Sequence, residues 1–92
     1  MDKAQADGYI NKGAAFFSDG DISQAIKNFL KALEYNSNSI EASFNLGFCY
    51  QIQNNYQQAI FYFRKTLKLK PQDQEAANNL AMSLANYGAI ML

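Results

Sequence analysis

Several residue types are missing or rare in this chain of 92 residues, which has no histidine, no tryptophan, one proline and one cysteine. Without histidine there is no common general acid or base, no Cys/His zinc site and no histidine-dependent catalytic triad. The single cysteine, Cys49, excludes a disulfide within the chain. With no histidine to activate it, we expect a buried structural thiol rather than a nucleophile. The composition therefore leaves only carboxylates, tyrosines and Cys49 to support any chemistry, and we expect no bound metal or cofactor.

Net charge and long apolar runs are also missing. Eight Lys and Arg balance eight Asp and Glu, so the chain lacks the positive field that favours nucleic acids or anionic membranes. No apolar run approaches the ~20 residues that a membrane-spanning helix needs. The start of the chain has no apolar signal segment, and no Asn-x-Ser/Thr acceptor occurs. We therefore expect a cytoplasmic protein with no membrane span and no nucleic-acid partner.

The most informative feature is an internal repeat with a period of 34 residues. One shift by this period aligns Asn11 with Asn45, Gly13 with Gly47, Ala25 with Ala59, Phe29 with Phe63 and Leu33 with Leu67. A second shift aligns Asn45 with Asn79 and Glu41 with Glu75. Self-similarity at such a period is typical of proteins built from stacked structural repeats.

Each period contains two amphipathic helices, because apolar residues recur at steps of three and four. Turn signals separate the helices at Asp19-Gly20-Asp21, at Asn36 to Ser39, at Asn54-Asn55 and at Pro71. We predict five helices, at residues 3–18, 22–35, 40–53, 56–69 and 74–87, and no strand. Gly88 stands where the other two periods have their turn, so the fifth helix is expected to end before it.

Residues 40–73 resemble a tetratricopeptide repeat across all 34 positions. The matching residues are Leu46, Gly47, Tyr50, Tyr56, Ala59, Phe63 and Pro71. Residues 6–39 match less completely, since Lys12 and Ser37 replace the usual leucine and proline, and residues 74–92 form only a partial repeat. The resemblance implies one all-α domain over residues 1–92, a right-handed superhelical solenoid of about two and a half helix-turn-helix repeats.

Small residues mark where the two helices of a pair would cross. Gly13, Gly47 and Ala81 occupy this place on the first helix of each repeat, with Ala25 and Ala59 facing them. The family pattern also implies which side of the fifth helix packs against the preceding repeat. Those residues are Ala77, Leu80, Ala81 and Leu84.

In this family the first helix of each repeat lines a concave groove that binds peptides or partner proteins without catalysis. The resemblance places Asp7, Ile10, Asn11, Ala14 and Phe17 of the first helix in this groove, with Glu41, Phe44, Asn45, Phe48 and Gln51 of the third, and Glu75, Asn78, Asn79, Met82 and Ala85 of the fifth. Phe44 and Phe48 lie four residues apart on one helix. They are either exposed apolar anchors for a ligand or ordinary packing between repeats.

One ligand of the family can be tested residue by residue. Members that hold the acidic C-terminal tails of chaperones use three cations and two asparagines to bind them. Those places hold Ile10, Ala14, Asn45, Glu75 and Asn79 here, and only Asn45 matches. We therefore do not expect such a tail as the ligand.

Two surfaces remain outside the groove. The apolar residues Leu84, Tyr87, Ile90, Met91 and Leu92 near the end of the chain suggest an alternative role, a fragment or structural unit that forms homo-oligomers through its uncovered last helix. Arg64, Lys65, Lys68 and Lys70 form a basic cluster on the fourth helix, which we interpret as a solvated face rather than a nucleic-acid site.

Overall fold

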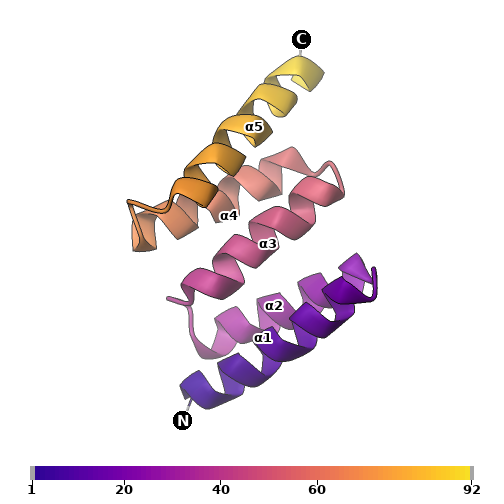
Figure 1. The fold of residues 1–92 in the computed structure, drawn as a ribbon, viewed down its shortest axis with the longest axis vertical. Helices are drawn as coiled ribbons and strands as arrows, with labels where there is room; N and C mark the ends of the chain where they lie inside the picture. The colour runs from indigo at the N-terminus through magenta and orange to yellow at the C-terminus, as the bar shows by residue number, and fades with distance from the viewer. Residues whose placement is uncertain (1, 92) are drawn as a thin grey trace.

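The computed structural model describes the backbone of residues 2–91 and the side chains of residues 2–88. It is built from five helices, α1 (Asp2–Ser18), α2 (Ile22–Tyr35), α3 (Ile40–Ile52), α4 (Tyr56–Leu69) and α5 (Gln74–Met91), which follow one another from one end of the molecule to the other (Figure 1). Residues 2–91 contain no strand. The all-α class is therefore confirmed, and the first four helices have their predicted bounds to within one residue.

The turns between paired helices follow from the residues that the repeat places there. Gly20 and Asn54 both have positive φ, 82° and 62°, which glycine and asparagine tolerate better than other residues. One residue later in each repeat, Asp21 and Asn55 accept a hydrogen bond from the backbone N–H three residues on, at 3.2 and 3.4 Å. The same local chemistry therefore reverses the chain twice, after α1 and after α3.

The boundaries between repeats are capped in the same way. The Ser39 hydroxyl accepts a hydrogen bond from the Ala42 N–H at 3.1 Å, and the Asp73 carboxylate accepts one from the Ala76 N–H at 3.1 Å. Ser39 is thus the N-cap of α3. These caps satisfy N–H groups that have no partner within the helix.

The predicted end of α5 was wrong. The helix continues through Gly88 to Met91, although Gly88 is the repeat equivalent of Gly20 and Asn54. In the first two repeats the turn is held in place by the helix that follows and packs back. No helix follows α5 within residues 2–91, so a helical glycine, at a cost of about 1 kcal/mol relative to alanine, is tolerated there.

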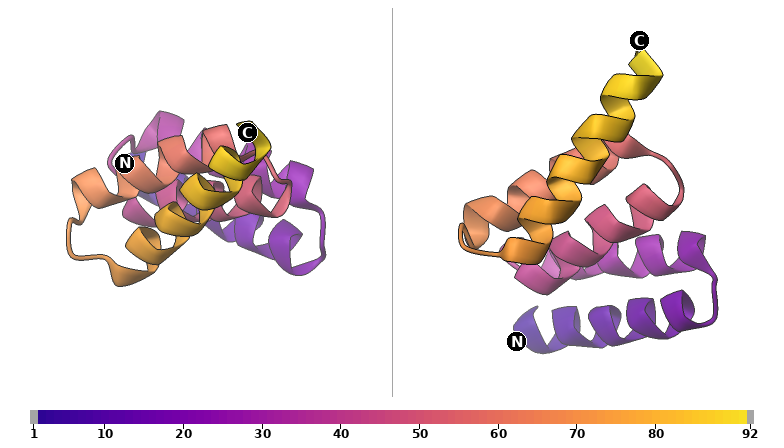
Figure 2. Two further views of the ribbon diagram at one scale, coloured as in Figure 1. Left: turned by 90° about the horizontal axis from the view of Figure 1, so that it is seen from above. Right: turned by 45° about the horizontal axis from the view of Figure 1, so that its top comes forward.

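The helices pack as neighbours in chain order, α1 on α2, α2 on α3, α3 on α4 and α4 on α5, with only slight contact between α3 and α5. Figure 2 shows the same stack from two further directions. At the centre of each complete pair a phenylalanine ring covers a glycine. A Cβ atom built on Gly13 would lie 2.6 Å from the Phe29 ring, and one on Gly47 would lie 2.7 Å from the Phe63 ring. This close approach explains why the repeat requires glycine at both places.

The buried face of α5 differs from the prediction. Its fully buried residues are Ala76 and Ser83, whereas Ala77 and Ala81 are exposed and Leu84 is 41% exposed. The positions of Ala77, Ala81 and Leu84 correspond to those on α1 and α3 that face the second helix of their own pair. Because α5 has no second helix within the described residues, this side of it remains uncovered.

None of the helices within residues 2–91 combines the length and apolar character that crossing a membrane would require.

Candidate peptide-binding groove

A hollow of about 330 Å³ lies where α1, α3 and α5 come together. Six of the predicted groove residues line it, namely Ala14, Phe17, Phe44, Asn45, Phe48 and Glu75. Two further residues complete the lining, Ser18 at the end of α1 and Phe29 of α2. The structure therefore brings together residues from all three helices that the family resemblance placed on the groove.

Three half-buried phenylalanines form the apolar wall of this hollow. The ring centroids of Phe17 and Phe48 are 5.8 Å apart, and those of Phe44 and Phe48 are 6.4 Å apart with nearly parallel planes. Phe44 also meets the buried ring of Phe63 edge to face at 5.7 Å. These distances are those of favourable aromatic pairs. The packing interpretation thus holds for both rings, since Phe48 contacts Phe17 of α1 and Phe44 contacts Phe63 of α4. Both side chains are only half-buried and line the hollow, so their role as ligand anchors stays a prediction.

The polar residues of the predicted groove fall into two groups. Asn45 and Glu75 border the hollow itself. Gln51 instead joins two helices, because its side-chain N–H₂ group donates to the Ser83 hydroxyl at 3.1 Å and to the Asn79 carbonyl at 3.4 Å. The Asn79 amide in turn donates to the Glu75 carbonyl at 2.9 Å. Gln51 therefore links α3 to α5, whereas the Asn79 side chain bonds within its own helix, and neither residue lines the hollow.

The remaining predicted groove residues lie elsewhere. Ile10 is only 5% exposed and belongs to the core, so its assignment to the groove surface was wrong. It is part of the hydrophobic core cluster, which the spacing along α1 alone could not reveal. Asn11, Glu41 and Met82 are exposed but do not line the hollow, and the same is true of Asp7, Asn78 and Ala85.

Ser18 and Phe29 were not predicted to be groove residues. Ser18 lies in the last turn of α1, four residues after the predicted groove residue Ala14. Extending the predicted pattern by one helical turn would have included it. Phe29 was expected to fill the space around the crossing of α1 and α2, and it is almost fully buried. It also borders the hollow, and no sequence signal distinguishes a buried side chain that borders a hollow from one that is fully enclosed.

Cys49 is fully buried, as predicted, and lies beside the core residue Leu46 rather than in the hollow. Burial raises the pKa of its thiol to about 11. Burial also raises the pKa of Tyr50 and Tyr62, whose rings stack with their centroids 5.8 Å apart. The Cys49 thiol is therefore protonated at neutral pH and is a poor nucleophile.

The residues predicted to mediate self-association are only partly described. Leu84 is partly exposed and Tyr87 is half-buried, both on α5. Leu92 and the side chains of Ile90 and Met91 lie outside the described part of the chain.

Comparison with known proteins supports the repeat assignment. A family model described as "Tetratricopeptide repeat" matches residues 40–73, and a second, described as "TPR repeat", matches residues 13–53. Photosystem I assembly protein Ycf3 of Synechococcus elongatus is 27% identical over 81 residues, which are 85% of this chain and 47% of that relative. A protein of the same name from Synechococcus sp. (strain CC9605) is 27% identical over 85 residues, 89% of this chain and 49% of the relative. The chain thus spans about half the length of the curated relatives it matches.

Solved structures show the same fold. The second TPR of Spaghetti (RPAP3), bound to the HSP90 peptide SRMEEVD, superposes with a TM-score of 0.90 at 18% identity, covering 95% of this chain and 81% of that one. The MamA protein superposes with a TM-score of 0.89 at 25% identity, covering 96% of this chain and 48% of that one.

Proposed function

Because the chain belongs to the tetratricopeptide repeat family, we propose that it is a non-enzymatic binding module whose hollow between α1, α3 and α5 holds a segment of a partner protein. The observation that carries the proposal is the composition of this hollow. It combines a wall of three half-buried phenylalanines with a polar border of Asn45 and Glu75. Apolar pockets with a few polar groups that fix orientation are typical of ligand sites.

The chemistry of the border suggests which peptide fits. The phenylalanine wall accepts an apolar side chain, and the Asn45 amide can exchange hydrogen bonds with the backbone of an extended peptide. Glu75 is exposed and would favour a Lys or Arg on the ligand. The preferred ligand is thus an extended segment with one apolar anchor next to a cationic residue.

This ligand differs from the one held by a protein of similar fold. The HSP90 peptide bound by the second TPR of Spaghetti carries two glutamates and an aspartate. No Lys or Arg lines the hollow of this chain, and the Glu75 carboxylate would repel an acidic peptide. The Synechococcus relatives are named for the assembly of Photosystem I, which supports a segment of a protein as the natural ligand.

Selection from a library of random extended peptides, followed by measurement of affinity by fluorescence anisotropy, tests this proposal. Phe48→Ala should weaken binding of the selected peptides about tenfold or more, because it removes an apolar contact that the ligand buries. It should also lower the free energy of unfolding by ~1–2 kcal/mol, less than the ~3–5 kcal/mol typical of a fully buried Phe. Glu75→Lys should shift the selected sequences from basic to acidic.

The matched control is Phe61→Ala, which removes the same side chain from the outer surface of α4, where it is 60% exposed. This variant should bind the selected peptides as tightly as the unmodified chain. Equal affinity of the unmodified chain and the Phe48→Ala variant would refute the proposal, provided that both remain folded by circular dichroism.

A further inference from the structure

A second groove lies between α4 and α5, and it shares no lining residue with the hollow described above. We propose that this α4/α5 groove binds an acidic amphipathic helix of a partner protein. The bound helix would lie beside α5 as α2 lies beside α1 and as α4 lies beside α3.

Comparison of the three repeats indicates that a helix is the kind of element that fits this face of α5. Gly13 of α1 and Gly47 of α3 are buried under the helix that follows each of them. The equivalent residue of α5, Ala81, is exposed, and so is Leu84 one turn later. Figure 1 shows α5 at the end of the stack, with neighbouring helices on one side only. Two of the three equivalent faces are thus covered by an amphipathic helix, whereas the third is exposed within the described residues.

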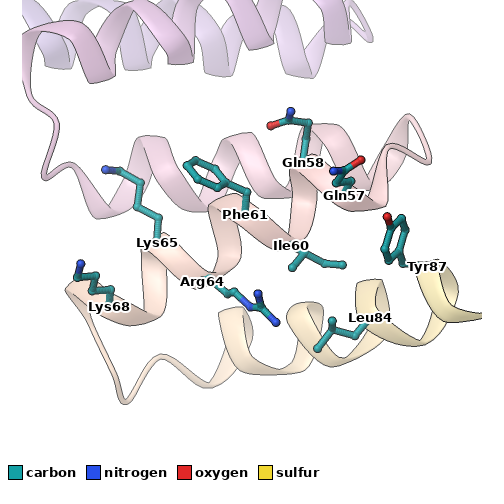
Figure 3. A pocket seen from close by; sticks show the side chains of 9 residues that line it. All are labelled: Gln57, Gln58, Ile60, Phe61, Arg64, Lys65, Lys68, Leu84 and Tyr87. Carbon is teal, nitrogen blue, oxygen red and sulfur yellow. The ribbon is translucent and has the colours of Figure 1, made fainter.

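The groove offers an apolar floor that could receive one face of such a helix. Its volume is about 940 Å³, and Ile60, Phe61, Leu84 and Tyr87 line it (Figure 3). Phe61 and Leu84 are 60% and 41% exposed, which is unusual for large apolar side chains on neighbouring helices. An apolar patch with a polar rim commonly marks a site of interaction with another protein.

The charged side chains at the rim of the groove indicate which charge a partner should carry. Arg64, Lys65 and Lys68 line one end, whereas no Asp or Glu lines the groove at all. Figure 3 shows these three cations at one end of α4, with Gln57 and Gln58 at the other. Within the described residues the only ion pair joins Lys31 to Glu34, so none of the three cations is neutralised there. A helix with carboxylates beside its apolar stripe complements this rim.

The same charges argue against a second copy of this chain as the occupant. In a symmetric dimer formed through the α4/α5 groove, the same patch would meet itself. Arg64, Lys65 and Lys68 of one copy would then approach the same cations of the other, and no carboxylate in the groove offsets the repulsion.

Ala81, which is exposed on α5 beside the groove and does not line it, also limits the side chains that the partner helix can carry. In the complete pairs, a phenylalanine ring occupies the space that a Cβ atom would fill on Gly13 or Gly47. Ala81 has such a Cβ atom, so a helix docked in the same way must carry a smaller or more flexible residue than phenylalanine at that place. The partner helix is therefore expected to carry leucine or a similar aliphatic residue opposite Ala81.

Two designed peptides test this inference. Both copy residues 22–35, the helix that covers α1, with leucine at the place of Phe29, and both are held helical by a hydrocarbon link on the solvent face. The acidic peptide carries glutamate at the places of Lys27, Lys31 and Glu34, and the basic peptide carries lysine at all three. Fluorescence anisotropy should show that the acidic peptide binds at least about tenfold more tightly than the basic one, and added salt should reduce this difference.

Three variants locate the binding. Phe61→Ala should weaken binding of the acidic peptide about tenfold, and its exposed position means that folding should be unaffected. Reversal of charge at Arg64, Lys65 and Lys68 to glutamate should make the basic peptide the tighter ligand. Reversal at Lys3, Lys12 and Lys27, which are exposed on α1 and α2, changes the net charge equally and should preserve the preference for the acidic peptide.

Equal affinity for the two peptides, no binding of the acidic peptide, or binding that Phe61→Ala leaves unchanged would overturn the inference. Sedimentation equilibrium provides a separate check. A dimer that forms as concentration rises and that Phe61→Ala abolishes would assign the groove to a second copy of the chain instead.

Discussion

Two glycines set how closely the paired helices approach each other. Gly13 and Gly47 each lie under a phenylalanine ring, and a methyl group at either place would stand within 3 Å of that ring. Gly8, also within a helix, has no atom within 4 Å of where its Cβ would be. The same residue type thus has opposite roles at these two kinds of position, and substitution by alanine should distinguish them.

We expect Gly47→Ala to destabilise the protein and Gly8→Ala to stabilise it. The first places a methyl group 2.7 Å from the Phe63 ring, and overpacking of this kind costs ~1–3 kcal/mol. The second improves helix propensity by up to ~1 kcal/mol at an unobstructed position. Urea denaturation followed by circular dichroism measures both changes in the free energy of unfolding. If Gly47→Ala were as stable as Gly8→Ala, the close packing of Phe63 on α3 would be disproved.

Burial could be predicted well in the two complete repeats, for example for Ala25, Phe29 and Cys49. Prediction failed where burial depends on an element remote in sequence. Ile10 was placed on the groove because its position along α1 says nothing of how deeply the neighbouring helices enclose it. Gln51 was placed there for the same reason, since its partner Ser83 lies 32 residues away.

Among the helices, local capping residues determine where α2, α3, α4 and α5 begin. Asp21, Ser39, Asn55 and Asp73 each accept a hydrogen bond from the first turn of the helix that follows. Such caps act within a few residues, so they can be read from the sequence alone. The end of α5 could not be read in this way. Gly88 permits a turn but does not impose one, and the outcome depends on whether a following helix packs back onto α5.

The uncovered side of α5 should affect its local stability. Backbone amides of residues 84–88 are expected to exchange hydrogen with solvent at least about tenfold faster than those of residues 46–50, because α3 has helices on both sides and α5 does not. Hydrogen exchange measured by NMR at single residues provides the comparison. Equal protection of the two segments would mean that α5 is held as firmly as α3, contrary to the role proposed for the α4/α5 groove.

The whole molecule presents two hollowed surfaces of opposite electrostatic character. The hollow between α1, α3 and α5 has aromatic walls and the carboxylate of Glu75 at its border. The α4/α5 groove has an aliphatic and aromatic floor with three cations at its rim. The zero net charge of the chain hides this separation. Composition alone therefore could not predict it, whereas the positions of the charges on the repeat could.

The fold followed from the sequence because the 34-residue period, the turn residues and the helical spacing all indicate the same architecture. The candidate site could be predicted from the sequence only in part. Family resemblance indicated which helices line the hollow, but the rings that form its wall lie on different helices. Their contacts, such as that of Phe17 with Phe48, depend on how adjacent repeats are oriented.

The most direct test of the central claim, that the hollow between α1, α3 and α5 is the peptide site, is an NMR titration of the isotope-labelled chain with a peptide selected from the random library. The account predicts that the largest shifts of backbone amide signals occur at Phe17, Asn45 and Phe48 and that they saturate with one peptide per chain. Shifts confined to α2 and α4, with those three residues unchanged, would contradict it.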